Sequence, residues 1–245
     1  MENIIPLLLI GVITLGASYI QGVTGFGFGI FAMIFLPRIL LYTEANLLSS
    51  ILSSLTSVFV VLTLFRKIHW KNLVFPVIGC LFSTYAAVSF IKTQKNETLI
   101  LFLGIALVAL SLYFFFFSDK CRIKATWYAG LIAGIASGLL SGMFAIGGPP
   151  VVIYFLQSEK DTEDYLATIS AYFIFSGVIS VSTKVAAGFL TNAVLLGIAV
   201  GLFGMLVGSF VGKLTRDKVS APVIKRAVYG VMAISGVVNI LTALL

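Results

Sequence analysis

Long apolar runs, each close to the length needed to cross a lipid bilayer, recur along this sequence. A transmembrane helix needs about 20 apolar residues, whereas barrel strands would appear as alternating segments of about 10 residues, which the sequence lacks. Only 10% of the residues are charged, against about 25% in an ordinary soluble domain. The chain is therefore predicted to be an all-α integral membrane protein, with spans at residues 45–65, 73–91, 99–117, 166–183, 193–212 and 227–245.

An internal repeat emerges when two Gly-rich segments, 20–36 and 140–156, are aligned with an offset of 120 residues. Chance could produce scattered matches between two apolar stretches, but paired glycines and a paired Thr-Glu favour duplication. Each half then holds one Gly-rich segment and three membrane helices, with the halves at residues 1–118 and 126–245 and a connecting loop at 119–125. The aligned pairs include Gly22 with Gly142, Gly27 with Gly147 and, after a shift of one residue, Glu44 with Glu163.

Glycine and proline interrupt each Gly-rich segment midway. In the second half, consecutive prolines predict that one helix ends near Phe144 and another begins around Pro149, because proline is tolerated in a first helical turn but not in a helix interior. In the first half, the corresponding break is expected between Gly22 and Gly27. Each half would thus contain a broken segment that either crosses the membrane once or turns back.

The distribution of Lys and Arg distinguishes these two topologies, because cytoplasmic loops carry most of the basic residues. A single crossing divides the sixteen basic residues seven to nine, whereas returning segments divide them twelve to four. The returning arrangement is more typical of a membrane protein and makes the two halves an inverted repeat. Both termini would then lie outside, and the loops around Arg66, Lys120 and Lys213 would be cytoplasmic. The four basic residues of the outer face would be Arg38, Lys92, Lys95 and Lys184.

The two broken segments would meet near the middle of the membrane, where non-helical backbone must be buried in protein or line a wet cavity. Helices that restart at Gly27 and Pro149 would direct free N–H groups and the positive ends of their dipoles at this point, which suits an anion. Alternatively, the glycines only allow close helix packing. The predicted substrate-binding residues of the breaks are Gln21, Gly22, Thr24, Gly25, Gly27, Gly29, Ser141, Gly142, Gly147, Gly148 and Pro149.

Hydroxyl side chains are concentrated in the first span after each break. Spacings of three and four place several of them on one helix face, where they either hold helices together or contact substrate. Ser50, Ser57 and Ser176 are the candidates for substrate contact. Lys184 is the only charged residue close to the inside of a predicted span; its side chain either extends to the membrane surface or attracts the anion.

Few residues offer catalytic or metal-binding chemistry. Cys80 lies in an apolar run, Cys121 lies in a loop and His69 stands alone, so neither a disulfide framework nor a metal site is expected. All nine Asp and Glu fall in or beside predicted loops, which leaves no buried carboxylate pair for an enzyme. The basic residues are scattered among short loops, which suits anionic membrane lipid better than nucleic acid. We therefore expect no catalytic residue, metal or cofactor.

The motifs GVTGFGFG at residues 22–29 and SGMFAIGGPP at 141–150 resemble the paired signatures of the TauE/SafE sulfite exporter family, also called 4-toluene sulfonate uptake permeases. The similarity covers essentially the whole chain and departs from the common pattern at Ala145, where glycine would match better. The resemblance implies a carrier of the bacterial or archaeal inner membrane for sulfite, sulfonates, sulfoacetate or similar anions, coupled to a proton or cation gradient. An anion channel and a non-transporting scaffold are the alternatives, and substrate, direction and oligomeric state stay open.

Overall fold

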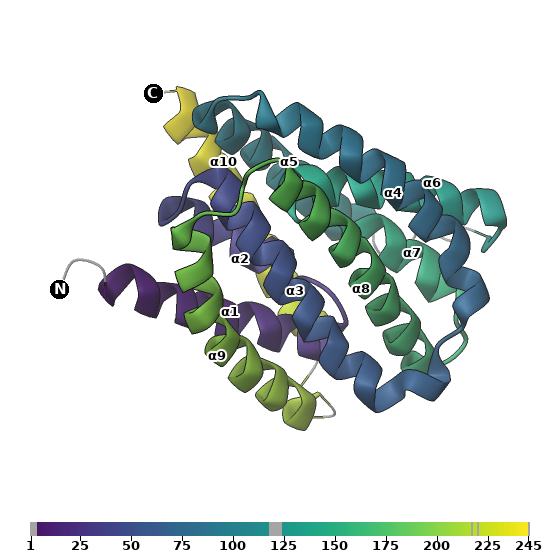
Figure 1. The fold of residues 1–245 in the computed structure, drawn as a ribbon. Helices are drawn as coiled ribbons and strands as arrows, with labels where there is room; N and C mark the ends of the chain where they lie inside the picture. Colours follow the sequence, from purple (N-terminus) through teal and green to yellow (C-terminus); the bar gives the residue numbers. More distant parts are fainter. Residues whose placement is uncertain (1–3, 118–123, 217, 220, 245) are drawn as a thin grey trace.

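The computed structural model describes residues 4–117, 124–216, 218–219 and 221–244, and their regular structure is helical throughout (Figure 1). The first half of the chain forms α1 (Ile4–Thr24), α2 (Phe28–Phe35), α3 (Tyr42–Leu64), α4 (Trp70–Lys92) and α5 (Asn96–Phe117). The second half forms α6 (Trp127–Phe144), α7 (Gly148–Ser158), α8 (Thr162–Ala186), α9 (Asn192–Thr215) and α10 (Ala221–Leu244). Two short 3-10 helices, η1 (Leu36–Arg38) and η2 (Phe65–Lys67), follow α2 and α3.

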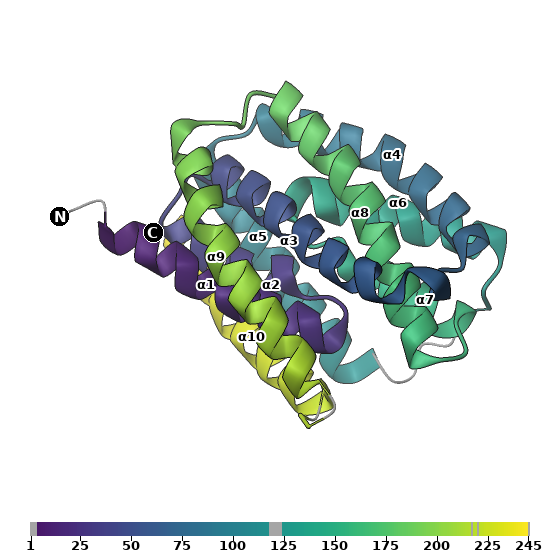
Figure 2. The same ribbon diagram turned by 60° about the horizontal axis from the view of Figure 1, so that its bottom comes forward.

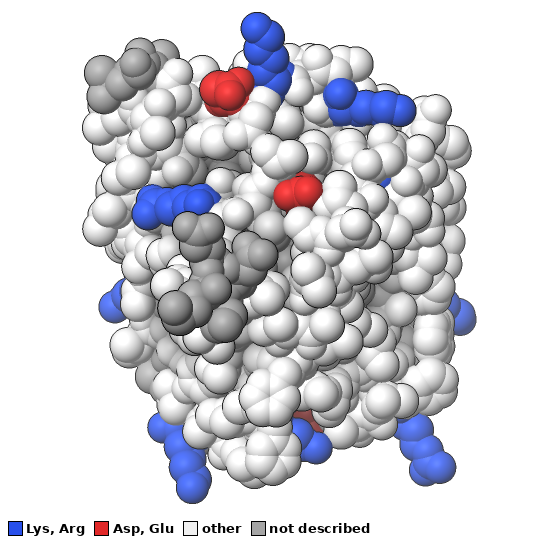
Figure 3. Space-filling model, turned by 60° about the vertical axis from the view of Figure 1, so that its left-hand side comes forward, with Lys and Arg blue, Asp and Glu red and all other residues white. Residues whose placement is uncertain are grey.

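The predicted all-α membrane fold is confirmed. Each of the six predicted apolar runs becomes one helix. Together with α1 and α6, they make 8 helices among the described residues that are long and apolar enough to cross a membrane. Their outer faces remain apolar: Leu62 and Phe203 are 76% and 74% exposed. In Figure 3 the charged side chains are scattered singly over a face that is mostly uncharged. Such a surface is stable only against lipid or another apolar partner.

Helices from the two halves alternate in the bundle (Figures 1 and 2). α4 of the first half packs along α6 of the second, and α9 of the second half packs along α1 of the first. α3 lies against α8, and α5 lies against α10. Glycines in α6 and α9 allow the first two pairs to approach with backbone in contact, as small residues do in membrane helix pairs.

Both broken segments turn back on themselves. A Cβ placed on Gly16 of α1 would lie 2.9 Å from the Phe31 ring of α2, so α2 runs back along α1. A Cβ placed on Gly130 of α6 would lie 3.0 Å from the Tyr154 ring of α7, so α7 likewise returns along α6. α6 ends at Phe144, as predicted, and the next helix begins one residue before the predicted Pro149.

The helix ends fall into two groups at opposite ends of the bundle. Glu44 at the start of α3 accepts a 2.7 Å hydrogen bond from Thr191, which directly precedes α9. At the other end, η2 forms ion pairs with the start of α8, and Lys213 shares a groove with the last residues of α3. The α3–α4 turn therefore lies at the same end as Lys213, in agreement with the predicted grouping of basic loops. The loop around Lys120 lies outside the described residues.

Candidate functional site

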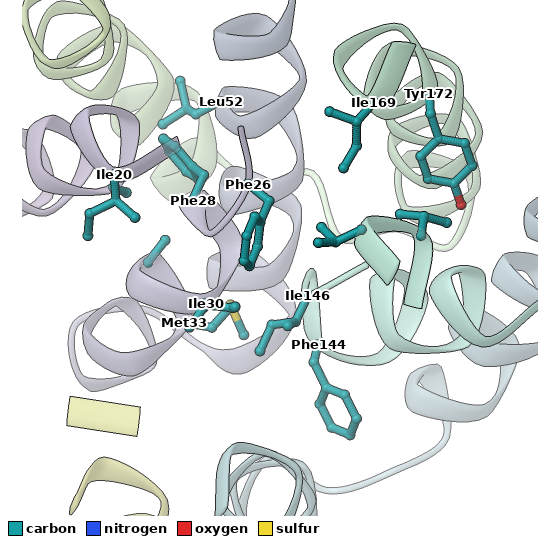
Figure 4. Packing of buried hydrophobic residues seen from close by; sticks show 14 of the residues in the cluster. Ile20, Phe26, Phe28, Ile30, Met33, Leu52, Phe144, Ile146, Ile169 and Tyr172 are labelled. Carbon is teal, nitrogen blue, oxygen red and sulfur yellow. The ribbon is translucent and has the colours of Figure 1, made fainter. Parts of the chain in front are cut away.

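The two breaks meet in the interior of the bundle, as the sequence predicts. Gly29 in the first turn of α2 lies directly against the carbonyl group of Ala145, and a Cβ at this position would overlap that group. On the other side of the contact, Phe26 packs against Gly148 at the start of α7, with 3.3 Å between the ring and a Cβ placed on the glycine. Figure 4 shows Phe26 and Ile146 filling the space between the two chain breaks.

A cavity of about 40 Å³ lies beside this contact. About 10–15 Å³ of such space holds one water molecule, so the cavity has room for only a few atoms. Eight of the predicted binding residues line it: Gln21, Gly27, Gly29, Ser50, Ser141, Gly147, Gly148 and Ser176. The other lining residues are Ile30, Ser53, Ser54, Ala145, Ile146, Phe173, Gly177 and Ser180.

Residues of the first turns of α2 and α7 line the cavity. α2 begins at Phe28 and α7 begins at Gly148, so the N–H groups of their first turns have no partner within their own helix. Gly29 and Gly148 carry two of these groups in the cavity wall. The positive ends of two helix dipoles consequently point into one small space.

Gln21 and the α3 serines form the polar wall on the side of the first half. The Gln21 amide donates to the Ser57 hydroxyl at 2.8 Å and to the Ser53 carbonyl at 3.1 Å, and it accepts from the Ser53 hydroxyl at 3.0 Å. Ser57 therefore orients Gln21 from behind and does not line the cavity, in contrast to its predicted contact with substrate. Some of the hydroxyls therefore hold helices together, and others line the cavity.

Lys184 lies behind the cavity and is completely buried, at 0% exposure. Its Nζ donates to Ser50 Oγ at 2.7 Å and to the Ser141 carbonyl at 3.0 Å, and both of these residues line the cavity. The interpretation that its side chain extends to the membrane surface is therefore wrong. No Asp or Glu lies among the described lining residues, and the ion pairs of the described residues do not include Lys184.

Ser180 contributes a hydroxyl that has no hydrogen-bond partner among the described residues, although Ser180 is fully buried and lines the cavity. An unpaired buried hydroxyl costs about 1–3 kcal/mol. A bound molecule in the cavity would give this group a partner.

Several predicted binding residues support the breaks from outside the cavity. Gly22 packs against Gly212, and its carbonyl accepts two hydrogen bonds from Arg216 at 2.7 and 3.0 Å. The Thr24 hydroxyl lies within hydrogen-bond distance of the Ile20 carbonyl in α1 and of the Phe26 carbonyl inside the break, and it can donate to either. Gly25 ends α1 with a φ of 83°, a conformation that favours glycine. These three residues shape the break and do not line the cavity.

The second break has two such residues. Gly142 packs against α4, where its Cβ would lie 2.6 Å from the Ala87 side chain. Pro149 is buried within the first turn of α7, where its missing N–H leaves no helical bond broken. Neither residue lines the cavity. The packing of α6 and α7 against neighbouring helices decides which of their faces is turned toward the cavity.

Two residues that the sequence analysis did not select hold the end of α6 in place. Asn46 Nδ2 donates to the Met143 carbonyl at 2.6 Å, and the Tyr42 hydroxyl donates to the same carbonyl. Both come from the start of α3, about 100 residues away in the chain. In the sequence, a polar Asn near the start of an apolar span could have indicated that Asn46 makes such a contact.

A bundle of apolar helices around a small polar cavity, formed where two broken helices meet, defines a multi-pass membrane transporter. The chain belongs to the TauE/SafE sulfite exporter family, since the model of that family, described as "Sulfite exporter TauE/SafE", matches residues 9–238. The protein of Cupriavidus necator called "Probable sulfite/organosulfonate exporter TauE" is 23% identical over 237 residues, which covers 94% of this chain and 92% of that protein. No solved structure matches the chain. The predicted family is therefore confirmed, as is a transporter in place of an enzyme.

Proposed function

We propose that this protein is a secondary carrier that moves sulfite and small sulfonates, such as methanesulfonate, across the cytoplasmic membrane, and that it binds them in the cavity between the two breaks. The observation that carries the proposal is the composition of the cavity wall. It combines hydroxyls and helix N-termini with a buried lysine behind it, and it contains no carboxylate among the described lining residues.

The electrostatics of this wall favour an anion. Each helix N-terminus contributes about half an elementary charge, and an anion bound beside Lys184 would favour the ammonium form of its side chain. A buried cation without a carboxylate partner is costly, so a bound anion would supply the missing counter-charge. The unpaired Ser180 hydroxyl would at the same time gain an acceptor.

A carrier fits the cavity better than the alternatives do. The cavity, with a volume of about 40 Å³, has room for only a few atoms, whereas a channel requires a continuous path through the membrane. A scaffold would not require a polar cavity with an unpartnered hydroxyl. For direction we adopt export, which the name of the C. necator relative indicates for that protein; an ion gradient would supply the energy.

We further propose that the two halves form an inverted repeat, with residues 1–118 and 126–245 as its units. Each broken segment packs against a helix of the other half, α6 against α4 and α1 against α9, and this reciprocal packing supports the architecture. So does the left-handed conformation shared by Gly25 and Ala145, which are 120 positions apart and end α1 and α6. Both termini would face outward, and the basic turns would face the cytoplasm and its anionic lipid.

Replacement of Lys184 tests the proposal. Lys184→Gln keeps donors for Ser50 and Ser141 but removes the charge, and charge-assisted hydrogen bonds contribute about 1.5–3 kcal/mol. We expect labelled sulfite to bind and cross proteoliposome membranes saturably with the wild-type protein, and roughly tenfold or more weakly with the variant. Lys92→Gln, an exposed lysine of α4, serves as the control. Flux that does not saturate, or cation flux insensitive to sulfite, would exclude the proposed carrier.

A further inference from the structure

A groove lies on the outer surface of the bundle, at the end that carries the α3–α4 turn. It runs between the last turns of α3 and α9, and Gly22 of α1 also contributes to its wall. Its volume is about 340 Å³, and among the described residues it shares no lining residue with the anion cavity. The groove is therefore a separate space, and its own walls decide what it can bind.

The walls of the groove are largely apolar and exposed. Phe59, Phe210 and Leu214 contribute to them, and these side chains are 43%, 62% and 59% exposed. All three belong to helices that are long and apolar enough to cross a membrane, so lipid surrounds them. A small hydrophilic anion gains nothing from such walls, whereas an acyl chain gains dispersion contacts along them.

Two basic side chains, Lys213 and Arg216, also line the groove, whereas no Asp or Glu does so among the described residues. Lys213 is in the last turn of α9, and Arg216 directly follows that helix. Their positive charges exceed the negative ends of the α3 and α9 dipoles, which contribute about half an elementary charge each. The orientation proposed above places them at the cytoplasmic leaflet, whose anionic headgroups attract basic residues. Apolar walls with a positive end complement an anionic phospholipid.

A second groove, between α4 and α8, occupies the corresponding place at the opposite end of the bundle. Lys92 and Ser182 line it, and alignment of the two halves pairs them with Lys213 and Thr63 of the first groove to within one residue. Its described lining contains one lysine, no arginine and no residue of either broken segment. The α4–α8 groove therefore lacks the second cation and the contact with a break, and it provides a matched comparison within the same chain.

We propose that the α3–α9 groove binds an anionic phospholipid of the cytoplasmic leaflet; the choice of leaflet rests on the proposed orientation of the carrier. One acyl chain lies along Phe59 and Phe210, and the lipid phosphate accepts hydrogen bonds from Lys213 beside the Arg216 guanidinium. Charge-assisted hydrogen bonds of this kind are stronger than neutral ones. A zwitterionic lipid fits the same walls but brings its own positive charge to the two basic side chains, so the site favours anionic lipid.

Arg216 connects this site with the first break. Its Nε and Nη2 donate to the Gly22 carbonyl at 3.0 and 2.7 Å. Gly22 is in the last turn of α1, and Gly25 and Gly27 follow it in the break. A phosphate next to the guanidinium holds that side chain, and with it the Gly22 carbonyl, in place. The bound lipid consequently stabilises the end of α1, next to Gln21 in the cavity wall.

Lipid binding can be measured on the delipidated protein in a neutral detergent, without sulfite. Native mass spectrometry counts the bound lipid, and thermal unfolding measures the stabilisation that a ligand of the folded state produces. The probes are dioleoyl phosphatidylglycerol, dioleoyl phosphatidylcholine and soluble glycerol phosphate. We expect phosphatidylglycerol to bind the wild-type protein and raise its melting temperature, and the other two probes to bind roughly tenfold or more weakly.

Two variants test the charge and the walls separately. Lys213→Gln should weaken phosphatidylglycerol binding roughly fivefold, the factor that corresponds to about 1 kcal/mol for one basic residue. Thr63→Trp fills the groove while both charges remain, so it should prevent binding; Thr63 is exposed, so the larger side chain leaves the core unchanged. Lys92→Gln and Ser182→Trp make the same changes in the α4–α8 groove, and both variants should bind the lipid as the wild-type protein does.

Equal binding of phosphatidylcholine or of glycerol phosphate would overturn the inference, as would unchanged binding by Lys213→Gln and Thr63→Trp. Loss of binding in the two α4–α8 variants would also overturn it, because that result would place the lipid in the other groove. These measurements do not depend on anion transport, so a failure of the proposed function would be seen separately.

Discussion

At the scale of single residues, Ala145 ends α6 in a conformation that L side chains rarely adopt. Its φ is 56°, and it is the only non-glycine with a positive φ among the described residues. Its counterpart in the first half, Gly25, has a φ of 83°. The alanine is therefore a strained residue at the edge of the cavity.

Ala145→Gly should stabilise the protein, because the left-handed conformation costs a residue with a Cβ about 1–2 kcal/mol. We expect a gain of about 1 kcal/mol, which corresponds to a rise in melting temperature of about 2–4 °C in a chain of this size. Thermal unfolding in detergent measures it. Gly25→Ala should have the opposite effect, since its Cβ would lie 2.8 Å from Leu166. A lower melting temperature for Ala145→Gly would show that the left-handed conformation is not strained.

At the scale of elements, two helix pairs carry the close contacts of the bundle. A Cβ on Gly134 of α6 would overlap the Pro76 carbonyl group of α4, and a Cβ on Gly208 of α9 would overlap the Leu15 carbonyl group of α1. In both pairs, a helix of the second half presents glycine to the backbone of a helix of the first half. Gly134 and Gly208 are consequently needed for close helix packing. This is the role that the alternative interpretation gave to the glycines of the two broken segments.

Gly134→Ala and Gly208→Ala should each destabilise the fold, because overpacking against a backbone group costs about 1–3 kcal/mol. Gly230→Ala in α10 is the matched control, since no atom lies within 4 Å of its added Cβ. Alanine is also the better helix former by about 1 kcal/mol, so the control should be neutral or stabilising. Melting temperatures in one detergent compare the three variants. Equal values would rule out the close contact of these helix pairs.

At the scale of the whole molecule, the two ends of the bundle should face opposite sides of the membrane. The α3–α4 turn lies at one end, and the start of α3, near the α4–α5 turn, lies at the other. The predicted cytoplasmic position of Cys121 falls outside the described residues. Engineered cysteines in the two described turns can test the same topology.

In a Cys121→Ser background, Lys95→Cys should react with an impermeant thiol reagent added to intact cells, whereas Lys71→Cys should react only after lysis. Both lysines are exposed, so accessibility depends on the side of the membrane alone. Cys80 is buried and should remain unlabelled, which provides the background level. Labelling of Lys71→Cys from outside would reverse the orientation that the basic residues indicate.

Much of the fold could be predicted because bilayer thickness, proline chemistry and charge act locally along the chain. Apolar length determined the helices, consecutive prolines determined where α7 begins, and the count of basic residues indicated that the broken segments return. The same local logic selected Gly29 and Gly147, whose places in the cavity wall follow from being next to a break.

Only the tertiary structure decided which face each side chain presents and which distant group it meets. Lys184 contacts Ser50 across 134 positions, and Glu159 contacts His69 across 90. A rotation of one helix by a single residue position, about 100°, would remove Ser176 from the cavity without changing any local pattern. Such contacts arise because packing between helices fixes their rotation, and that packing depends on the whole bundle.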